Sequence, residues 1–203
     1  MRVVHVVDTG LANVASVVAG LERAGASAVR TRDARDVERA ELLVLPGVGS
    51  FGAGMGSLRE AGVVEPLRER VVGGRATLAI CLGMQMLFEG SDEAPEVEGV
   101  GAIPGRFGAF PEDGQSTHFG WNSVEAPIGA RFIGSGFAYF AHSYRTDADP
   151  GGWSCARTEL NGVYTSALER DAVLACQFHP ELSGVWGRGL LSRWVTQGEA
   201  VVE

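Results

Sequence analysis

The hydrophobic positions in the first half of the chain alternate between two kinds of pattern. Short runs that are apolar almost throughout, many of them β-branched, predict buried strands. There are four of them: Val3–Val7, Ser27–Thr31, Glu41–Leu45 and Ala76–Ile80. Because apolar strands separated by helical segments are typical of a parallel sheet covered on both faces, the pattern predicts an α/β fold.

The segments between these strands show helical spacing. Val14, Val17, Val18 and Leu21 follow the i, i+3, i+4, i+7 spacing of an amphipathic helix, and Gly25 stands where that helix would end. Leu58–Val72 carries a second helical pattern, which Gly62 and Pro66 interrupt. Leu82–Phe88 predicts a third helix, directly after the fourth strand.

The composition and the hydrophobic pattern of the sequence change after Gly90. Residues 91–170 are rich in Gly and Pro with short alternating or aromatic runs, which predicts antiparallel hairpins and loops added to the sheet. Ala172–Phe178 predicts a last strand, and Trp186, Leu190, Leu191 and Trp194 can form one face of a closing helix. Since no repeat or linker separates the parts, we expect residues 1–203 to form a single domain.

Composition narrows the class of protein. With 17 basic and 25 acidic residues the formal charge is −8, which argues against nucleic acid as a partner. No window approaches the roughly 20 apolar residues of a membrane helix, and the polar N-terminal segment does not resemble a secretory signal. Three cysteines without CxxC spacing argue against a disulfide framework and against a structural zinc site. These features favour a reduced, cytoplasmic protein.

One glycine motif allows two interpretations. Gly47, Gly49 and Gly52 satisfy the G-x-G-x-x-G spacing of a dinucleotide-binding turn. That motif belongs after the first strand and needs an acidic residue at the end of the next one, but here it follows the third strand and the next strand ends at Cys81. We favour a loop whose backbone must approach another group closely.

Cys81 lies at the junction of a strand and a helix, in the stretch AICLGMQ. A cysteine at the end of a strand is often only a small buried hydrophobe. A strand-to-helix turn, however, exposes a nucleophile above the sheet, and the helix N-terminus stabilises a thiolate. Ala79 and Gly83 are the small residues that such a turn requires. Cys155 and Cys176 lack these surroundings, so we expect both to be structural.

A cysteine nucleophile needs a base and a group that orients the base. His179 ends the last strong strand in the stretch QFHPELSG. Proline favours an extended conformation for the residue before it, and positions i and i+2 of an extended chain face the same side. Glu181 can therefore reach the ring of His179 and leave the other ring nitrogen for Cys81.

These stretches resemble a known family. CLGMQ followed about a hundred residues later by HPE is similar to the class I (triad) glutamine amidotransferases, whose fold is flavodoxin-like. Three further stretches, LPGVGSFGAGM, HFGWN and YFAHSY, resemble their subgroup of glutaminase subunits of imidazole glycerol phosphate synthase. The resemblance runs from the first strand to the last helix.

The resemblance implies a reaction and a set of site residues. Cys81 would attack the side-chain amide of L-glutamine, and His179, oriented by Glu181, would transfer protons, without a cofactor or a metal. The backbone N–H groups of Val48 and Leu82 would stabilise the oxyanion. The resemblance also implies glutamine-binding positions: Gly47, Gly49, Gln85, Ser143 and Tyr144.

The resemblance also implies a partner that receives the ammonia, a (β/α)8-barrel cyclase subunit in a heterodimer. The positions near its docking face would be Asn13, His118, Trp121 and Asn122. Two residues depart from the family pattern: Ala79 replaces Gly, and Leu182 replaces a basic residue after HPE. Leu182 keeps open an alternative, a paralogous amidotransferase that feeds another synthase, for example in surface-sugar biosynthesis. A third possibility is a non-catalytic regulatory subunit on the same fold.

Overall fold

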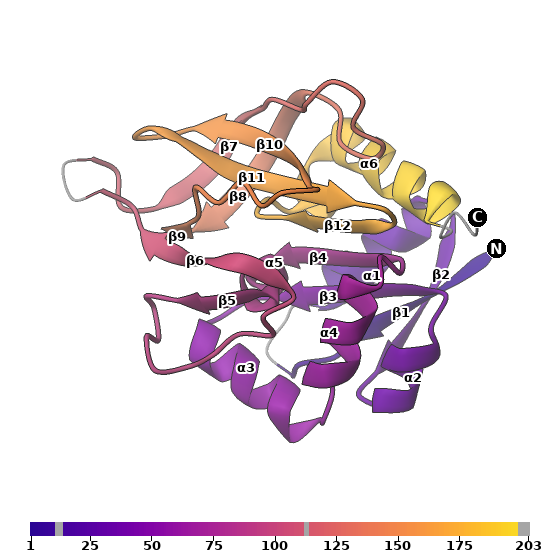
Figure 1. Ribbon diagram of the computed structural model, residues 1–203. Coiled ribbons are helices and arrows are strands. Elements are labelled where there is room, and N and C mark those ends of the chain that lie inside the picture. Colours follow the sequence, from indigo (N-terminus) through magenta and orange to yellow (C-terminus); the bar gives the residue numbers. More distant parts are fainter. Residues whose placement is uncertain (11–13, 112–113, 199–203) are drawn as a thin grey trace.

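The computed structural model describes residues 1–10, 14–111 and 114–198, and a seven-stranded sheet runs through its centre (Figure 1). In spatial order the strands are β10 (Ser154–Glu159), β11 (Val163–Arg170), β12 (Val173–Cys176), β4 (Thr77–Cys81), β3 (Leu42–Gly47), β1 (Arg2–Val7) and β2 (Ala26–Thr31). The last five pair in parallel, and β10 and β11 extend the sheet antiparallel. The order β2-β1-β3-β4-β12 is the flavodoxin-like winding that the sequence predicts.

Both faces of the sheet are covered. One face packs against α1 (Val14–Arg23), α6 (Gly184–Gln197) and the hairpin of β7 (His118–Val124) and β8 (Gly136–His142). The other face packs against α2 (Ala34–Arg39), α3 (Phe51–Glu60), α4 (Val64–Val72) and α5 (Leu82–Leu87). A small sheet of β5 (Phe88–Ser91), β6 (Ile103–Ala109) and β9 (Tyr144–Arg145) lies at its end (Figure 1).

The strands supply both cores by alternation. In β3, Leu42 and Val44 belong to the core under α1 and α6, whereas Leu43 and Leu45 belong to the core under α3 and α4. Because side chains point to opposite faces with a period of two, a strand between two helical layers must be apolar at every position. This explains why β3 and β4 are continuous apolar runs.

The predicted helix over Leu58–Val72 is wrong as a single element. The chain forms α3 and α4 instead, and Gly62 separates them with a φ of +67°, a conformation that glycine adopts without strain. Pro66 lies in the first turn of α4, where its missing N–H has no helical partner to lose. The start of α3 is marked by Ser50, whose hydroxyl accepts a hydrogen bond from the N–H of Ala53.

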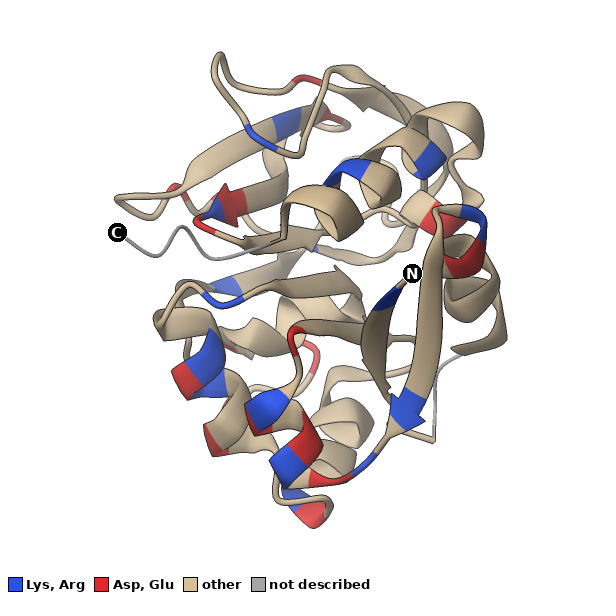
Figure 2. Cartoon of the chain, turned by 90° about the vertical axis from the view of Figure 1, so that its right-hand side faces the viewer, with Lys and Arg blue, Asp and Glu red and all other residues tan. Residues whose placement is uncertain are grey.

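Acidic and basic residues alternate along the chain in the view of Figure 2, where both signs occur on the same helices. In that view there is no basic stripe of the kind that nucleic-acid binding requires. Within the described part of the chain, no helix has the length and apolar character needed to cross a membrane.

Candidate active site

Cys81 occupies a strained turn between β4 and α5. Its backbone has φ 53° and ψ −114°, a region that L-residues rarely adopt, and its side chain stands at the N-terminus of α5. Gly83 leaves no room for a side chain, because a Cβ there would collide with the carbonyl oxygen of Leu45. The turn is therefore a nucleophile elbow in geometry, as the sequence predicts.

Ala79, the residue that departs from the family pattern, is accommodated in the sheet. It is fully buried in β4, where it pairs with Leu45 of β3 and Ala175 of β12. Its methyl group belongs to the core on the α3 and α4 side, two residues before the elbow.

His179 and Glu181 form the pair that their spacing predicts. The Nδ1 atom of His179 lies 2.8 Å from Oε1 of Glu181. His179 is extended, with φ −101° and ψ 95°, but Glu181 lies in a short 3-10 turn, η1 (Pro180–Leu182), and not in extended chain. The contact therefore forms through a turn after Pro180 rather than through the alternation of a strand. The N–H of His179 donates to the carbonyl of Tyr139, which ties the base to β8.

The electrostatic setting of His179 favours its charged form. Burial disfavours the imidazolium, but the hydrogen bonds to Cys81 and Glu181 and the charges of those groups outweigh it and raise the pKa of His179 to about 10. The ring is thus hydrogen-bonded to Glu181, and it lines the same cavity as Cys81. Such a Cys–His–Glu set can perform nucleophilic attack and proton transfer.

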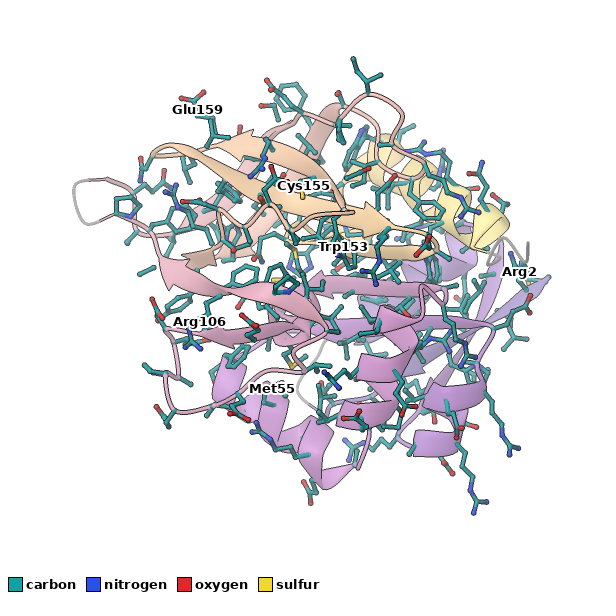
Figure 3. The ribbon with its side chains drawn as sticks, in the orientation of Figure 1. Arg2, Met55, Arg106, Trp153, Cys155 and Glu159 are labelled. Atoms are coloured by element: carbon teal, nitrogen blue, oxygen red, sulfur yellow. The ribbon has the colours of Figure 1, made fainter. Side chains whose placement is uncertain are left out.

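The other two cysteines lie in surroundings that disfavour a thiolate. Burial raises the pKa of the Cys176 thiol well above its usual value. Burial and the nearby Asp149 raise the pKa of Cys155 to about 12. Cys155, labelled in Figure 3, lies on the edge strand β10, and the sheet order places β11 and β12 between it and β4. Their structural role stays a prediction that these surroundings support.

A cavity of about 230 Å³ opens beside the sulfur of Cys81. It is lined by Val48, Gly49, Cys81, Leu82, Gln85, Glu93, Ala141, His142, Ser143, Tyr144 and His179. The cavity thus brings together the predicted triad nucleophile and base, both predicted oxyanion residues and four of the five predicted glutamine-binding residues. Gly47 packs beneath it, since a Cβ on Gly47 would meet Leu82 and Gly83.

The sequence prediction missed several residues of this cavity. Of the described residues that line it, Glu93 is the one carboxylate, and its Oε2 accepts a hydrogen bond from the N–H of Phe51. Gln177 donates through Nε2 to the Cys81 sulfur at 3.6 Å, and its Oε1 accepts from Gln85 at 3.1 Å. Gln177 precedes His179 by two positions, so the alternation of side chains along a strand could have indicated that both face the same side. Glu93 lies among other acidic loop residues, and nothing in its sequence surroundings points to the cavity.

The residues predicted near a docking face differ in their exposure. The Trp121 side chain is 58% exposed. Asn122 is engaged within the chain, since it donates to the carbonyl of Glu159 and accepts from the N–H of Ser123. His118 is buried, with its Nδ1 2.7 Å from the hydroxyl of Tyr164, so its ring does not reach the surface and we remove it from the docking face. Asn13 lies outside the described residues.

Metal ligation finds no support in this part of the molecule. Among residues 1–10, 14–111 and 114–198 there is no group of three or more His, Cys, Asp or Glu side chains that could hold a metal ion.

Comparison with known proteins agrees with the fold and with the composition of the cavity. The family profile "Glutamine amidotransferase class-I" matches residues 5–194. A solved glutamine amidotransferase superposes with a TM-score of 0.77 at 22% identity, over 96% of this chain and 98% of the other. The chain belongs to the class I glutamine amidotransferase family.

Its relatives narrow the family to one subgroup, the HisH subunits. A protein of Exiguobacterium sibiricum named imidazole glycerol phosphate synthase subunit HisH is 37% identical over 94% of this chain and 93% of its own length. A Thermus thermophilus protein of the same name is 40% identical over 92% and 93%. In Emericella nidulans, a longer protein named imidazole glycerol phosphate synthase hisHF is 36% identical over 92% of this chain and 36% of its own length.

Proposed function

We propose that the chain, acting as one domain, is the glutaminase subunit of an imidazole glycerol phosphate synthase. It hydrolyses L-glutamine to glutamate and ammonia and passes the ammonia to a cyclase subunit in histidine biosynthesis. The observation that carries the proposal is the placement of Cys81 on a strained elbow in the same cavity as His179, which is itself bonded to Glu181 at 2.8 Å. The HisH relatives supply the particular synthase.

The reaction begins with the thiolate of Cys81. It attacks the side-chain carboxamide carbon of glutamine, and the imidazolium of His179 donates its proton to the departing ammonia. The resulting γ-glutamyl thioester is then hydrolysed by a water that neutral His179 deprotonates. Glu181 holds the ring by its Nδ1 and stabilises the positive charge in each cycle.

The oxyanion of each tetrahedral intermediate needs donors beside the sulfur. Leu82, at the start of α5, supplies one backbone N–H. Val48 supplies the second from the loop after β3, which the close contact of Gly47 with Leu82 and Gly83 holds against the elbow. Gly49 has a φ of +95°, so the Val48–Gly49 peptide is next to a position that glycine alone adopts easily.

The far end of the cavity suits the amino-acid part of glutamine. Glu93 faces the cavity as a carboxylate and matches the charge of the substrate ammonium group. Gln85, oriented by Gln177, and the Ser143–Tyr144 segment provide polar groups around it. With its amino-acid part bound there, the substrate glutamine extends its neutral side-chain amide toward Cys81.

Ammonia needs a route out that avoids bulk water. A second cavity of about 180 Å³ lies on the other side of Val48 and His179, between α1 and the β3 loop. It shares these two residues with the glutamine cavity, so the two cavities are neighbours. We assign this second cavity to ammonia transfer.

The partner would dock on a nearby apolar surface. Five exposed side chains, which we call the apolar docking surface, come from the β7–β8 hairpin, the end of η1 and the start of α6: Phe119, Trp121, Phe137, Leu182 and Val185. We propose that a (β/α)8-barrel cyclase covers this surface in a heterodimer. The fused Emericella nidulans relative supports a stable pairing, and the three free cysteines support a reducing, cytoplasmic location.

Leu182 favours one second candidate, a paralogous amidotransferase that supplies ammonia to a different synthase. Its apolar side chain is 47% exposed beside the catalytic His179 and Glu181, where the family carries a basic residue. A non-catalytic subunit is less favoured, because the triad contacts are intact.

The decisive experiment measures glutamate release from glutamine by the chain alone and together with the cognate cyclase and its nucleotide substrate. We expect low activity alone and strong stimulation by the complex. Cys81→Ala should reduce the stimulated rate by at least about 1,000-fold, because the nucleophile is lost. Cys176→Ala is the matched control and should keep the rate.

An unchanged rate in Cys81→Ala would contradict the mechanism. A cyclase that neither binds nor stimulates the chain would instead favour the paralogous amidotransferase.

A further inference from the structure

Three buried side chains form a hydrogen-bonded chain behind the glutamine cavity. His118 opens β7, His142 ends β8 directly opposite it, and Tyr164 lies on β11. His118 Nδ1 is 2.7 Å from the Tyr164 hydroxyl, which is 3.3 Å from His142 Nε2. His142 Nδ1 is 2.8 Å from the carbonyl oxygen of Tyr144. The proposed reaction uses none of these three side chains as a reacting group.

The proton positions in this chain follow from its last acceptor. A carbonyl oxygen can only accept, so Nδ1 of His142 carries a proton and Nε2 of the neutral ring is an acceptor. Tyr164 must then donate its hydroxyl proton to His142 and accept one from Nδ1 of His118. One direction of hydrogen bonding, from His118 through Tyr164 and His142 to Tyr144, satisfies all four groups.

The surroundings keep the three side chains uncharged, as this arrangement requires. Burial lowers the pKa of His118 to about 4. Burial lowers the pKa of His142 to about 3, and the charges of His118 and His179 add to the effect while the bond to Tyr144 opposes it. Burial raises the pKa of the Tyr164 phenol, and Arg145 only partly offsets this. His118 also stacks on Phe140, with ring centroids 4.1 Å apart.

The end of the hydrogen-bonded chain lies at the substrate cavity. Tyr144 and Ser143 line that cavity, and Ala141, which precedes His142, has its carbonyl 3.9 Å from the Cys81 sulfur. Tyr144 is held on one side by pairing of β9 with Ala109 of β6 and on the other by the His142 ring. The orientation of the Tyr144 carbonyl thus depends on where the His142 ring is held.

We propose that Tyr164 and His118 are positioning residues for glutamine: they hold the His142 ring at its Nε2 atom and thereby hold the Ser143–Tyr144 segment in the geometry that binds the substrate. The proposal rests on the glutaminase function and adds to it three residues that do not take part in bond making. On this proposal the three residues affect binding of the amino-acid end of glutamine and not the chemistry at Cys81.

Tyr164→Phe tests the proposal because it keeps the ring and deletes only the hydroxyl. Two buried imidazoles then lose their common partner, and Nε2 of His142 no longer has the hydrogen bond that holds the ring in place. In the complex with the cyclase, we expect the KM for glutamine to rise about tenfold and kcat to stay within about twofold of wild type. An unchanged KM, or an equal fall in kcat, would overturn the proposal.

A pair of substitutions at His118 separates the hydrogen bond from packing. His118→Phe keeps a flat ring against Phe140 but has no donor, so it should raise the KM as Tyr164→Phe does. His118→Asn places an amide N–H near the position of Nδ1 and should recover most of the lost affinity. If the phenylalanine variant has the lower KM of the two, the positioning role is excluded.

Thr158→Val is the matched control for lost stability. Thr158 is buried on β10 and donates to the carbonyl of Ser123 on β7, but it is not among the residues that line the cavity. It should lower the melting temperature while leaving the KM unchanged; a raised KM would assign the Tyr164→Phe effect to general destabilisation.

Failure of the glutaminase function is recognised separately. It would appear as a wild-type complex that releases no Cys81-dependent glutamate. Failure of the positioning role would appear as a normal KM in a Tyr164→Phe complex whose wild-type counterpart is active. Nitrogen-15 NMR of labelled histidine gives an independent readout, since we expect the Nε2 resonance of His142 to shift in Tyr164→Phe, where the hydrogen bond from the Tyr164 hydroxyl is lost.

Discussion

His179 and His142 line the same cavity, yet their surroundings shift their pKa values in opposite directions. Both rings are largely buried, which disfavours the charged form in each. His179 contacts Cys81 and Glu181, and its pKa rises to about 10. His142 contacts a phenol and a backbone carbonyl, and its pKa falls to about 3. The charge of the neighbours, and not the degree of burial, separates the two histidines.

The difference teaches how one small cavity can hold both a proton-transferring and a proton-fixed imidazole. A ring between a thiolate and a carboxylate gains a proton readily and can deliver it to a leaving group. A ring between neutral groups keeps one tautomer and serves as a fixed donor. The charged neighbour is thus what makes His179 suited to acid–base work.

The largest effect is expected from removing the charge that distinguishes His179. Glu181→Gln should lower kcat on the order of 100-fold, because the imidazolium loses its stabilising carboxylate. The pKa of His179 should fall, so the acid form is lost at a lower pH. The pH dependence of kcat/KM in the complex should therefore show its alkaline limb displaced toward neutral pH.

Glu159→Gln is the control for this substitution. It makes the same change of charge on an exposed residue of the edge strand β10, which Figure 3 labels at the periphery. Its pH profile should match the wild type. A Glu181→Gln profile with an unmoved alkaline limb would break the comparison between the two histidines.

A smaller effect is expected on stability in acid. His118 and His142 have folded pKa values below the usual 6.5, so the unfolded chain binds more protons once the pH falls below 6.5. Their contribution is complete above that pH and is lost as the pH falls toward 4 and 3. Each should lower the free energy of unfolding by up to about 1.4 kcal/mol per pH unit, measured by denaturant titration between pH 7.5 and 5.

Variants of the two kinds of histidine should separate this effect. His118→Phe removes one of the acid-sensitive rings and should flatten the slope by about one proton. His179→Asn removes a ring whose folded pKa is raised, so its own stabilisation is present below 6.5 and is lost only as the pH rises toward 10. It should leave the acid slope unchanged, and a flattened slope in His179→Asn would contradict the assignment.

The parts of the molecule that local pattern controls were predictable from the sequence. The parallel strands, the elbow at Cys81 and the His179–Glu181 pair depend on apolar runs, small residues and a spacing of two. The strand β5 and the short helix α2 were not predicted, because α2 has only Val37 as a buried residue and gives no helical stripe. The comparison with the HisH subunits confirms the family that the motifs indicate.

The rest of the candidate site depends on contacts between distant segments. Glu93 enters the cavity because its carboxylate binds the N-terminus of α3, forty-two positions earlier. His118 resembled a docking residue in the sequence, but its register opposite His142 turns it toward Tyr164 in the interior. Alternation along a strand predicts two faces but does not say which one is buried. The buried position of His118 becomes evident only from the packing of β7 against β8 and β11.

The backbone conformation of Cys81 is one that glycine would adopt at a lower cost in free energy than cysteine does. A φ of 53° with a ψ of −114° costs an L-residue about 1–3 kcal/mol and costs glycine far less. Cys81→Gly should therefore melt at a higher temperature than Cys81→Ala, while both lack the nucleophile. The protein retains a less stable residue at the point where its sulfur is needed, which is a trade of thermal stability for activity.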